Sequence, residues 1–177
     1  MFRIILAVML IFTSVFSSAL WAKASCKLTN IVASTPLTRF NLNGDATVTD
    51  LKTGLMWKQC PEGKSGSDCL TGNYQNAFWD TSLNEIVKLN AGAGFAGYKD
   101  WRMPNVKELR SIIEAQCYGP AVNEEVFPNT PLVNFLTSSL VNDTDRNRIW
   151  AIEFRFGRVE RMNITTSAYV RLVRTAK

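Results

Sequence analysis

Four cysteines place the strongest constraint on how this chain can fold. They are Cys26, Cys60, Cys69 and Cys117. In an exported chain, an even number of cysteines favours disulfides over metal or redox chemistry. Cys60 and Cys69 bracket a polar, glycine-rich loop, so pairing them is the simplest closure, and Cys26 is left for Cys117. On the chain-entropy model the short loop stabilises by about 2.7 kcal/mol and the long one by about 4.6 kcal/mol.

Two other uses of the cysteines are disfavoured. Four free buried thiols are unusual in an exported protein. A zinc site is disfavoured because the chain has no C-x-x-C pair and no histidine. The absence of histidine also removes Ser-His-Asp and Cys-His catalysis, histidine metal triads and the usual general base. We therefore predict a protein that is not an enzyme and that uses no cofactor and no metal ion.

The N-terminus has the three parts of a secretory signal. A short basic start with Arg3 precedes an apolar run over residues 4–16, and a small-residue pattern follows at Ala22 and Ala24. We predict a signal peptide over 1–24 and one mature domain over 25–177, which is secreted, periplasmic or on the cell surface. An uncleaved membrane anchor is the alternative, but the apolar run is shorter than the roughly 20 residues of a spanning helix. No transmembrane span is expected after cleavage.

Charge is unevenly distributed along the sequence. Residues 146–177 carry eight basic side chains and two acidic ones, a charge of +6, whereas residues 25–145 carry ten basic and thirteen acidic ones, or −3. A basic C-terminal third suggests an anionic partner. The alternative is that these arginines simply line the outer face of a sheet. Nucleic acid is not expected as the partner, because the protein is exported and the mature excess is only +3.

The hydrophobic pattern predicts an α+β fold. We expect a hairpin over 47–57, a helix from Ser82 that is capped by Ser82 and Glu85, and a second helix from Asn105 that ends near Cys117. Residues 150–156 alternate as a strand with Trp150, Ile152, Phe154 and Phe156 inward, and Gly157 turns the chain into a returning strand. Residues 168–173 predict a final central strand, and 142–148 and 163–167 have the composition of exposed loops.

Several of these segments together resemble the Lcl C-terminal domain family, which is named for a collagen-like bacterial adhesin. The resemblance rests on residues 47–57, on 100–109 with Met103 where leucine is usual, on 127–130, on 150–157, and on 169–174. The cysteine-bracketed loop over 60–69 also matches. Leu136 stands where the family usually has tryptophan, and the later loops have fewer tyrosines than those of many relatives.

The resemblance implies a C-type-lectin-like fold with two helices and short antiparallel sheets, stapled by disulfides. It also implies a secreted or surface-exposed bacterial protein, and the adhesin's own domain is associated with sulfated glycosaminoglycans. A calcium-dependent sugar site is not implied, because residues 104–105 lack the flanking carboxylates that such a site needs. Acidic pairs at Glu124 and Glu125 or at Asp143 and Asp145 are more simply explained as solvated loops.

We predict that the basic side chains after residue 145 form a ligand-binding surface. Arginine matches sulfate and carboxylate geometry in two-point contacts. Glu153 and Glu160 would dilute this surface and pair across the hairpin. The predicted binding residues are Arg146, Arg148, Arg155, Arg158, Arg161 and Asn163.

Two further features of the sequence are expected to have structural roles. Trp57, Trp101 and Trp150 are expected to be buried core residues rather than sugar-stacking platforms. Arg102 is expected to pair with Asp100 or with a buried carbonyl.

Three functions remain open at this point. The first is a non-catalytic binding module for an anionic or polar ligand, such as an acidic or sulfated surface glycan or a surface protein. The second is a cysteine-dependent enzyme of a lectin-related fold, which would need free thiols. The third is a structural component of the cell envelope that meets a partner protein.

Overall fold

Two small antiparallel sheets organise the molecule. The structure, a computed structural model, describes residues 23–142, 144 and 147–176. The first sheet has four strands in the order β11-β4-β3-β2. Their bounds are β2 Phe40–Leu42, β3 Thr47–Asp50, β4 Leu55–Lys58 and β11 Val173–Thr175. The predicted hairpin between β3 and β4 is confirmed, and Gly54 supplies its turn with φ at +67°.

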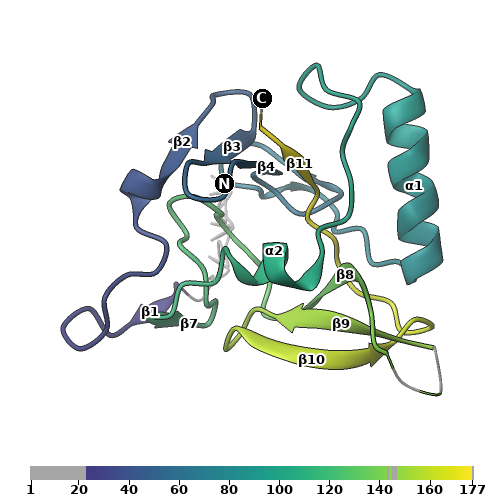
Figure 1. Ribbon diagram of the computed structural model, residues 1–177. Helices are drawn as coiled ribbons and strands as arrows, with labels where there is room; N and C mark the ends of the chain where they lie inside the picture. The colour runs from purple at the N-terminus through teal and green to yellow at the C-terminus, as the bar shows by residue number, and fades with distance from the viewer. Residues whose placement is uncertain (1–22, 143, 145–146, 177) are drawn as a thin grey trace, which may run out of the picture.

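The second sheet has three strands in the order β10-β9-β8. They are β8 Asn134–Leu140, β9 Arg148–Glu153 and β10 Arg158–Asn163. The predicted hairpin at Gly157 is also confirmed: φ there is +69°, and a Cβ atom would come within 2.7 Å of the Ile113 side chain. Figure 1 shows this sheet below the short helix α2 (Val106–Arg110).

Two pairs of very short strands complete the β structure, each beside a disulfide. β1 (Ser25–Cys26) pairs with β7 (Cys117–Tyr118), and β5 (Lys64–Ser65) pairs with β6 (Thr71–Gly72). Both predicted disulfides, Cys26–Cys117 and Cys60–Cys69, are confirmed, and no cysteine is free. Cys117 was expected at the end of a helix, and that prediction is wrong: it lies in β7, directly opposite Cys26.

The hydrophobic core lies on both faces of the three-stranded sheet. One cluster joins Trp57 and Leu109 to Ile152 and Phe154. The other joins Trp101 and Ile86 to Ile149 and Ala151. Because β9 is covered on both faces, the predicted alternation is wrong in detail: Ile149 and Ala151 are buried as well as Ile152 and Phe154, whereas Phe156 is exposed.

Both helices differ from their predicted bounds. α1 spans Trp79–Ala91, three residues earlier than expected, and Ser82 is buried inside it instead of capping it with Glu85. α2 ends at Arg110, well short of Cys117. Its capping box is formed by Asn105 and Glu108, so its predicted start is confirmed. A 3-10 turn over Leu37–Arg39 precedes β2.

The final strand is not central. β11 lies at the end of its sheet's strand order, next to β4, and begins only at Val173. The preceding residues instead make isolated bridges, among them Ala168 with Ala77 and Tyr169 with Phe135. Within the described residues, none of the helices is long and apolar enough to cross a membrane. The predicted signal peptide lies outside the described residues except for Lys23 and Ala24.

A candidate binding face on the β9–β10 hairpin

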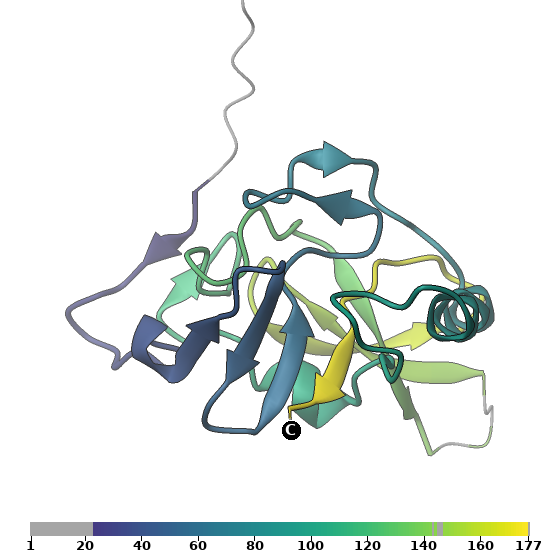
Figure 2. The same ribbon diagram turned by 90° about the horizontal axis from the view of Figure 1, so that it is seen from above.

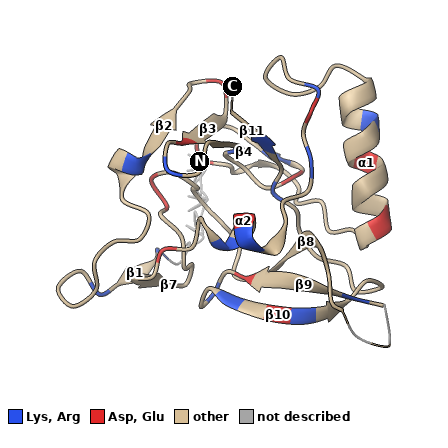
Figure 3. Cartoon of the chain, in the orientation of Figure 1, with Lys and Arg blue, Asp and Glu red and all other residues tan. Residues whose placement is uncertain are grey.

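The β9–β10 hairpin carries most of the predicted binding residues that the structure describes. Its register sets Arg161 opposite Trp150 and Asn163 opposite Arg148. Directly opposed residues and residues two apart along a strand share a face of the sheet. These four side chains therefore share one face at one end of the hairpin. Figure 3 shows basic segments at the beginning and in the second half of β10, with an acidic one between them.

Arg161 and Trp150 form the centre of this face. The guanidinium carbon of Arg161 lies 5.2 Å from the centroid of the Trp150 ring, a cation–π contact. Arg161 is exposed and Trp150 is half-buried, so the expectation of a buried core role is wrong for Trp150. For Trp57 and Trp101 it is confirmed. Trp150 shares its face of β9 with Ile152, but Ile152 packs into a core cluster and Trp150 belongs to neither cluster.

Asn163 contributes to this face mainly by shaping it. Its side-chain oxygen accepts hydrogen bonds from the backbone nitrogen of Thr165 at 2.9 Å and from the Thr165 hydroxyl at 2.8 Å. The backbone nitrogen of Ile164 donates to the carbonyl of Asn147. Asn163 thus fixes the turn that leaves β10, and the turn lies beside the start of β9.

The remaining arginines do not join this group. Arg158 lies opposite Glu153 at the other end of the hairpin, roughly 16 Å along the strand from Asn163 at 3.3 Å per residue. Its guanidinium lies 4.8 Å from the Phe156 ring centroid, and Phe156 stacks on Tyr118. Arg155 lies in the turn between the strands. The predicted single cluster is therefore divided in two, and Arg146 lies outside the described residues.

Glu153 does not pair across the hairpin with a neighbouring arginine as expected. Its carboxylate accepts hydrogen bonds from the backbone nitrogens of Arg155 and Phe156, so it closes the turn. At the other end of the hairpin, the residue directly opposite Arg161 is Trp150, which carries no negative charge.

Other arginines of the basic C-terminal third are structural. Arg171 and Arg174 are buried, so the exposed positive charge of residues 146–177 is smaller than the sequence charge of +6 indicates. Arg174 binds Asp100 at 2.7 Å. Arg102 was expected to pair with Asp100 or with a buried carbonyl, and its guanidinium instead makes two 2.7 Å hydrogen bonds to Glu108 at the start of α2.

A small slot adjoins the turn that Asn163 shapes. It has a volume of about 240 Å³ and is lined by Phe78, Trp79, Asp80, Ile164 and Thr165. Phe78 is 50% exposed, and the Trp79 indole nitrogen donates to the carbonyl of Thr137. No sequence pattern indicates this slot, because its two walls are more than eighty residues apart in the chain. They are joined by a hydrogen bond from the backbone nitrogen of Trp79 to the carbonyl of Ile164.

A larger groove lies elsewhere, between α1 and residues 170–172. Its volume is about 510 Å³, and its polar lining includes Glu62 and Glu85. Both carboxylates are already in ion pairs, with Lys58 and Lys88 respectively. This groove therefore has no excess positive charge with which to select an anion.

Comparison with known proteins adds one match. The model of the Lcl C-terminal domain family matches residues 46–174, which is most of the chain and includes the whole β9–β10 hairpin. No curated protein gives a significant match to the sequence. The match to this family and the two disulfides are together consistent with an extracellular or secreted domain. The chain belongs to the Lcl C-terminal domain family.

Proposed function

We propose that this protein is an exported, non-catalytic binding module that recognises an anionic or polar ligand, such as an acidic surface glycan. The binding face is formed by Arg148, Trp150, Arg161 and Asn163. The observation that carries the proposal is the exposed Arg161 guanidinium over the half-buried Trp150 ring, beside Arg148 and Asn163 on the same face.

The chemistry of these groups suits an acidic sugar. An arginine fork binds a sulfate or carboxylate through two parallel hydrogen bonds, and an aromatic ring offers an apolar surface to the face of a sugar ring. The adjoining slot beside Phe78 and Trp79 adds further aromatic surface, with Asp80 and Thr165 as hydrogen-bonding partners for sugar hydroxyls.

A C-type-lectin-like architecture is part of the proposal. Family membership supports it, as do the α+β fold with short antiparallel sheets and the pair of disulfides. The disulfides also bear on the enzyme alternative. All four cysteines are paired in disulfides, which favours a structural role for them over cysteine-dependent chemistry.

Glycan-array binding by the purified protein tests the proposed face. Arg148→Ala and Arg161→Ala should each weaken binding to sulfated or uronic-acid glycans by about tenfold, the loss of one charge-assisted contact. Arg158→Ala is the matched control, because it removes an exposed arginine from the other end of the same hairpin. Equal losses of affinity in all three variants would show that total charge, and not this face, determines binding. If the native protein bound no glycan on the array, the proposal of a glycan ligand would be wrong.

A further inference from the structure

The groove between α1 and residues 170–172 has the size and the lining of a small-molecule site. Its volume of about 510 Å³ lies within the range of ligand pockets in proteins, roughly 300–1,000 Å³. Ligand pockets combine apolar walls with a few polar groups that orient the ligand. The apolar side chains that line this groove are Ala77, Ile86, Leu89, Val170 and Leu172. They offer a surface for the apolar body of a small organic molecule.

The helix that forms one wall of the groove is held at both ends. Before its first turn, the backbones of Ala77 and Ala168 exchange two hydrogen bonds of 3.1 Å. Near its last turn, the Asn90 side chain donates to the carbonyl of Trp101 at 2.7 Å and accepts from the Trp101 backbone nitrogen at 3.1 Å. Figures 1 and 2 both show α1 at one side of the molecule. Because both ends of α1 are fixed, the groove beside its middle turns is formed before any ligand binds.

The charged side chains that line the groove carry a net negative charge. They are two carboxylates, Glu62 and Glu85, and one ammonium group, Lys88, which gives a charge of −1. The Lys58 ammonium, which pairs with Glu62, does not face the groove in the same way: Lys58 is 8% exposed, and its nitrogen lies 4.2 Å from the centroid of the Phe95 ring. Charge complementarity therefore favours a cationic ligand in the groove and disfavours an anionic one.

Both carboxylates can accept further hydrogen bonds. The Oε1 atom of Glu62 is buried and lies 2.7 Å from the Lys58 nitrogen, while the Glu62 side chain keeps 18% of its surface exposed. A carboxylate has about four lone-pair sites, so one such group can bind two ammonium groups. Glu85 is 45% exposed, and its ion pair with Lys88 is of the weak, solvent-screened kind. An ammonium group in the groove can bind to either carboxylate.

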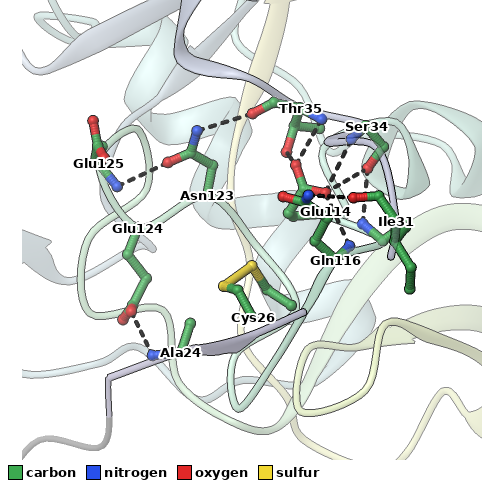
Figure 4. Close-up of a disulfide and its surroundings, with 12 residues drawn as sticks. Ala24, Cys26, Ile31, Ser34, Thr35, Glu114, Gln116, Asn123, Glu124 and Glu125 are labelled. Atoms are coloured by element: carbon green, nitrogen blue, oxygen red, sulfur yellow. Dashed lines mark hydrogen bonds between the residues drawn. A yellow bond between two sulfur atoms is a disulfide. The ribbon is translucent and has the colours of Figure 1, made fainter. Parts of the chain in front are cut away.

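Another cavity with carboxylates, of about 230 Å³, lies beside the Cys26–Cys117 disulfide. Its carboxylates already accept hydrogen bonds from the chain itself, as Figure 4 shows: Ser34 donates to Glu114, and the backbone nitrogen of Ala24 donates to Glu124. Glu114 is also almost completely buried. The carboxylates of the groove are more accessible, so the groove is better suited to a cationic ligand than this cavity is.

We propose that the groove binds a small organic ammonium compound. Its apolar body lies against Ile86, Leu89 and Leu172, and its ammonium group binds the carboxylates of Glu62 and Glu85. Burial of the apolar body supplies affinity, and the carboxylates select the charge of the head group. This inference does not rest on the glycan-binding proposal, because the groove lies apart from the face around Trp150.

Three ligands with the same ring and different head groups test the proposal. Each is titrated into the purified, ¹⁵N-labelled protein, and the amide shifts of residues 81–89 are followed by NMR. 2-Phenylethylammonium should give saturable shifts in this segment. 2-Phenylethanol should bind about tenfold more weakly, because it loses a charge-assisted hydrogen bond. 3-Phenylpropionate should give no saturable shift, because its carboxylate meets a negatively charged groove.

Three variants locate the site. Thr81→Trp places an indole in the groove from an exposed position and should abolish binding of 2-phenylethylammonium. Val87→Trp is the matched control: Val87 is 66% exposed on the opposite side of α1, so binding should be unchanged. Glu62→Gln should reduce the preference for the ammonium compound over the alcohol.

The possible outcomes separate the parts of the proposal. The absence of a saturable shift with 2-phenylethylammonium overturns the proposal. Equal affinities of the native protein for the ammonium compound and the alcohol overturn the role of the carboxylates, and full binding by Thr81→Trp overturns the location. None of these results depends on whether the protein binds a glycan.

Discussion

Glu114 shows how a single buried carboxylate can hold a segment in place without a cation. It is 3% exposed and accepts hydrogen bonds from Ser34, Thr35 and the backbone of Gln116. Burial alone would raise its pKa, but these donors outweigh burial, and the pKa lies below the ordinary 4.5. Asp50 and Glu108 also have lowered pKa values; burial again opposes the shift, and hydrogen bonds from Arg39 and Arg102 respectively outweigh it.

These lowered pKa values predict the behaviour in acid. As the pH falls, these carboxylates are protonated in the unfolded chain before they are protonated in the folded chain. Their contribution to folding stability is therefore complete above about pH 4.5, and it is lost as the pH falls through the folded pKa of each group. Glu114→Gln should cost about 1–3 kcal/mol at pH 7 and flatten the loss of stability below pH 4.5. Urea unfolding over a pH series measures both effects. Glu85→Gln, which alters an exposed ion pair, should leave the profile unchanged.

Arg171 is the second residue whose role is internal. Its guanidinium donates to the carbonyls of Lys58 and Gln59 and to the hydroxyl of Thr130, and it lies over the Phe127 ring. Complete burial lowers its pKa to about 9. Arg171→Ala should destabilise the fold by about 3 kcal/mol or more, because it leaves buried acceptors unpaired and opens a cavity. In thermal unfolding, Arg171→Ala should lose much more stability than Arg161→Ala, which alters an exposed side chain. Stability losses of similar size in the two variants would argue against an internal role for Arg171.

At the scale of elements, α2 shows why a very short helix forms here. Five residues are too few for a stable isolated helix. Asn105 and Glu108 satisfy each other's backbone nitrogens at 2.9 and 2.8 Å, and Arg102 holds the Glu108 carboxylate. Asn105→Ala should therefore cost about 1 kcal/mol. Asn105→Ser, which keeps an acceptor, should restore most of it in urea unfolding, whereas equal losses would rule out the cap as the cause.

Elements specified by neighbouring residues were predictable from the sequence. The β3–β4 and β9–β10 hairpins and the start of α2 follow from turn glycines and a capping box. The end of α2 was not predictable, because tertiary packing, and not a continued helix, buries Ile112 and partly buries Ile113. The same holds for Trp150: the alternating pattern does not distinguish it from Ile152 on the same face of β9, and only the tertiary packing buries Ile152 in a core cluster.

The candidate site was predictable only in part, for a related reason. Composition identified Arg161 and Arg148, but counting charges cannot tell an exposed arginine from Arg171 or Arg174, which long-range contacts bury. The Phe78 slot also depends on residues that meet only after folding.

At the scale of the whole molecule, the two disulfides close loops of very different length. Cys26 and Cys117 are 91 residues apart, and Cys60 and Cys69 are nine apart. The loop-entropy model predicts that removing the first bridge by Cys26→Ser with Cys117→Ser costs about 4.6 kcal/mol, and removing the second by paired serines about 2.7 kcal/mol. Calorimetry of the two double variants tests this order. The reverse order would mean that local strain or residual structure dominates.

The strand β10 has an evolutionary consequence. Met162 is its buried residue, and the other five positions are exposed or half-buried. Met162 packs into one of the core clusters, whereas substitutions at the other five positions leave both clusters in place and change the side chains next to Trp150. Under the proposed function, related domains can therefore change ligand preference at these positions of β10 at little cost in folding, and the strand is a natural place to build a combinatorial library.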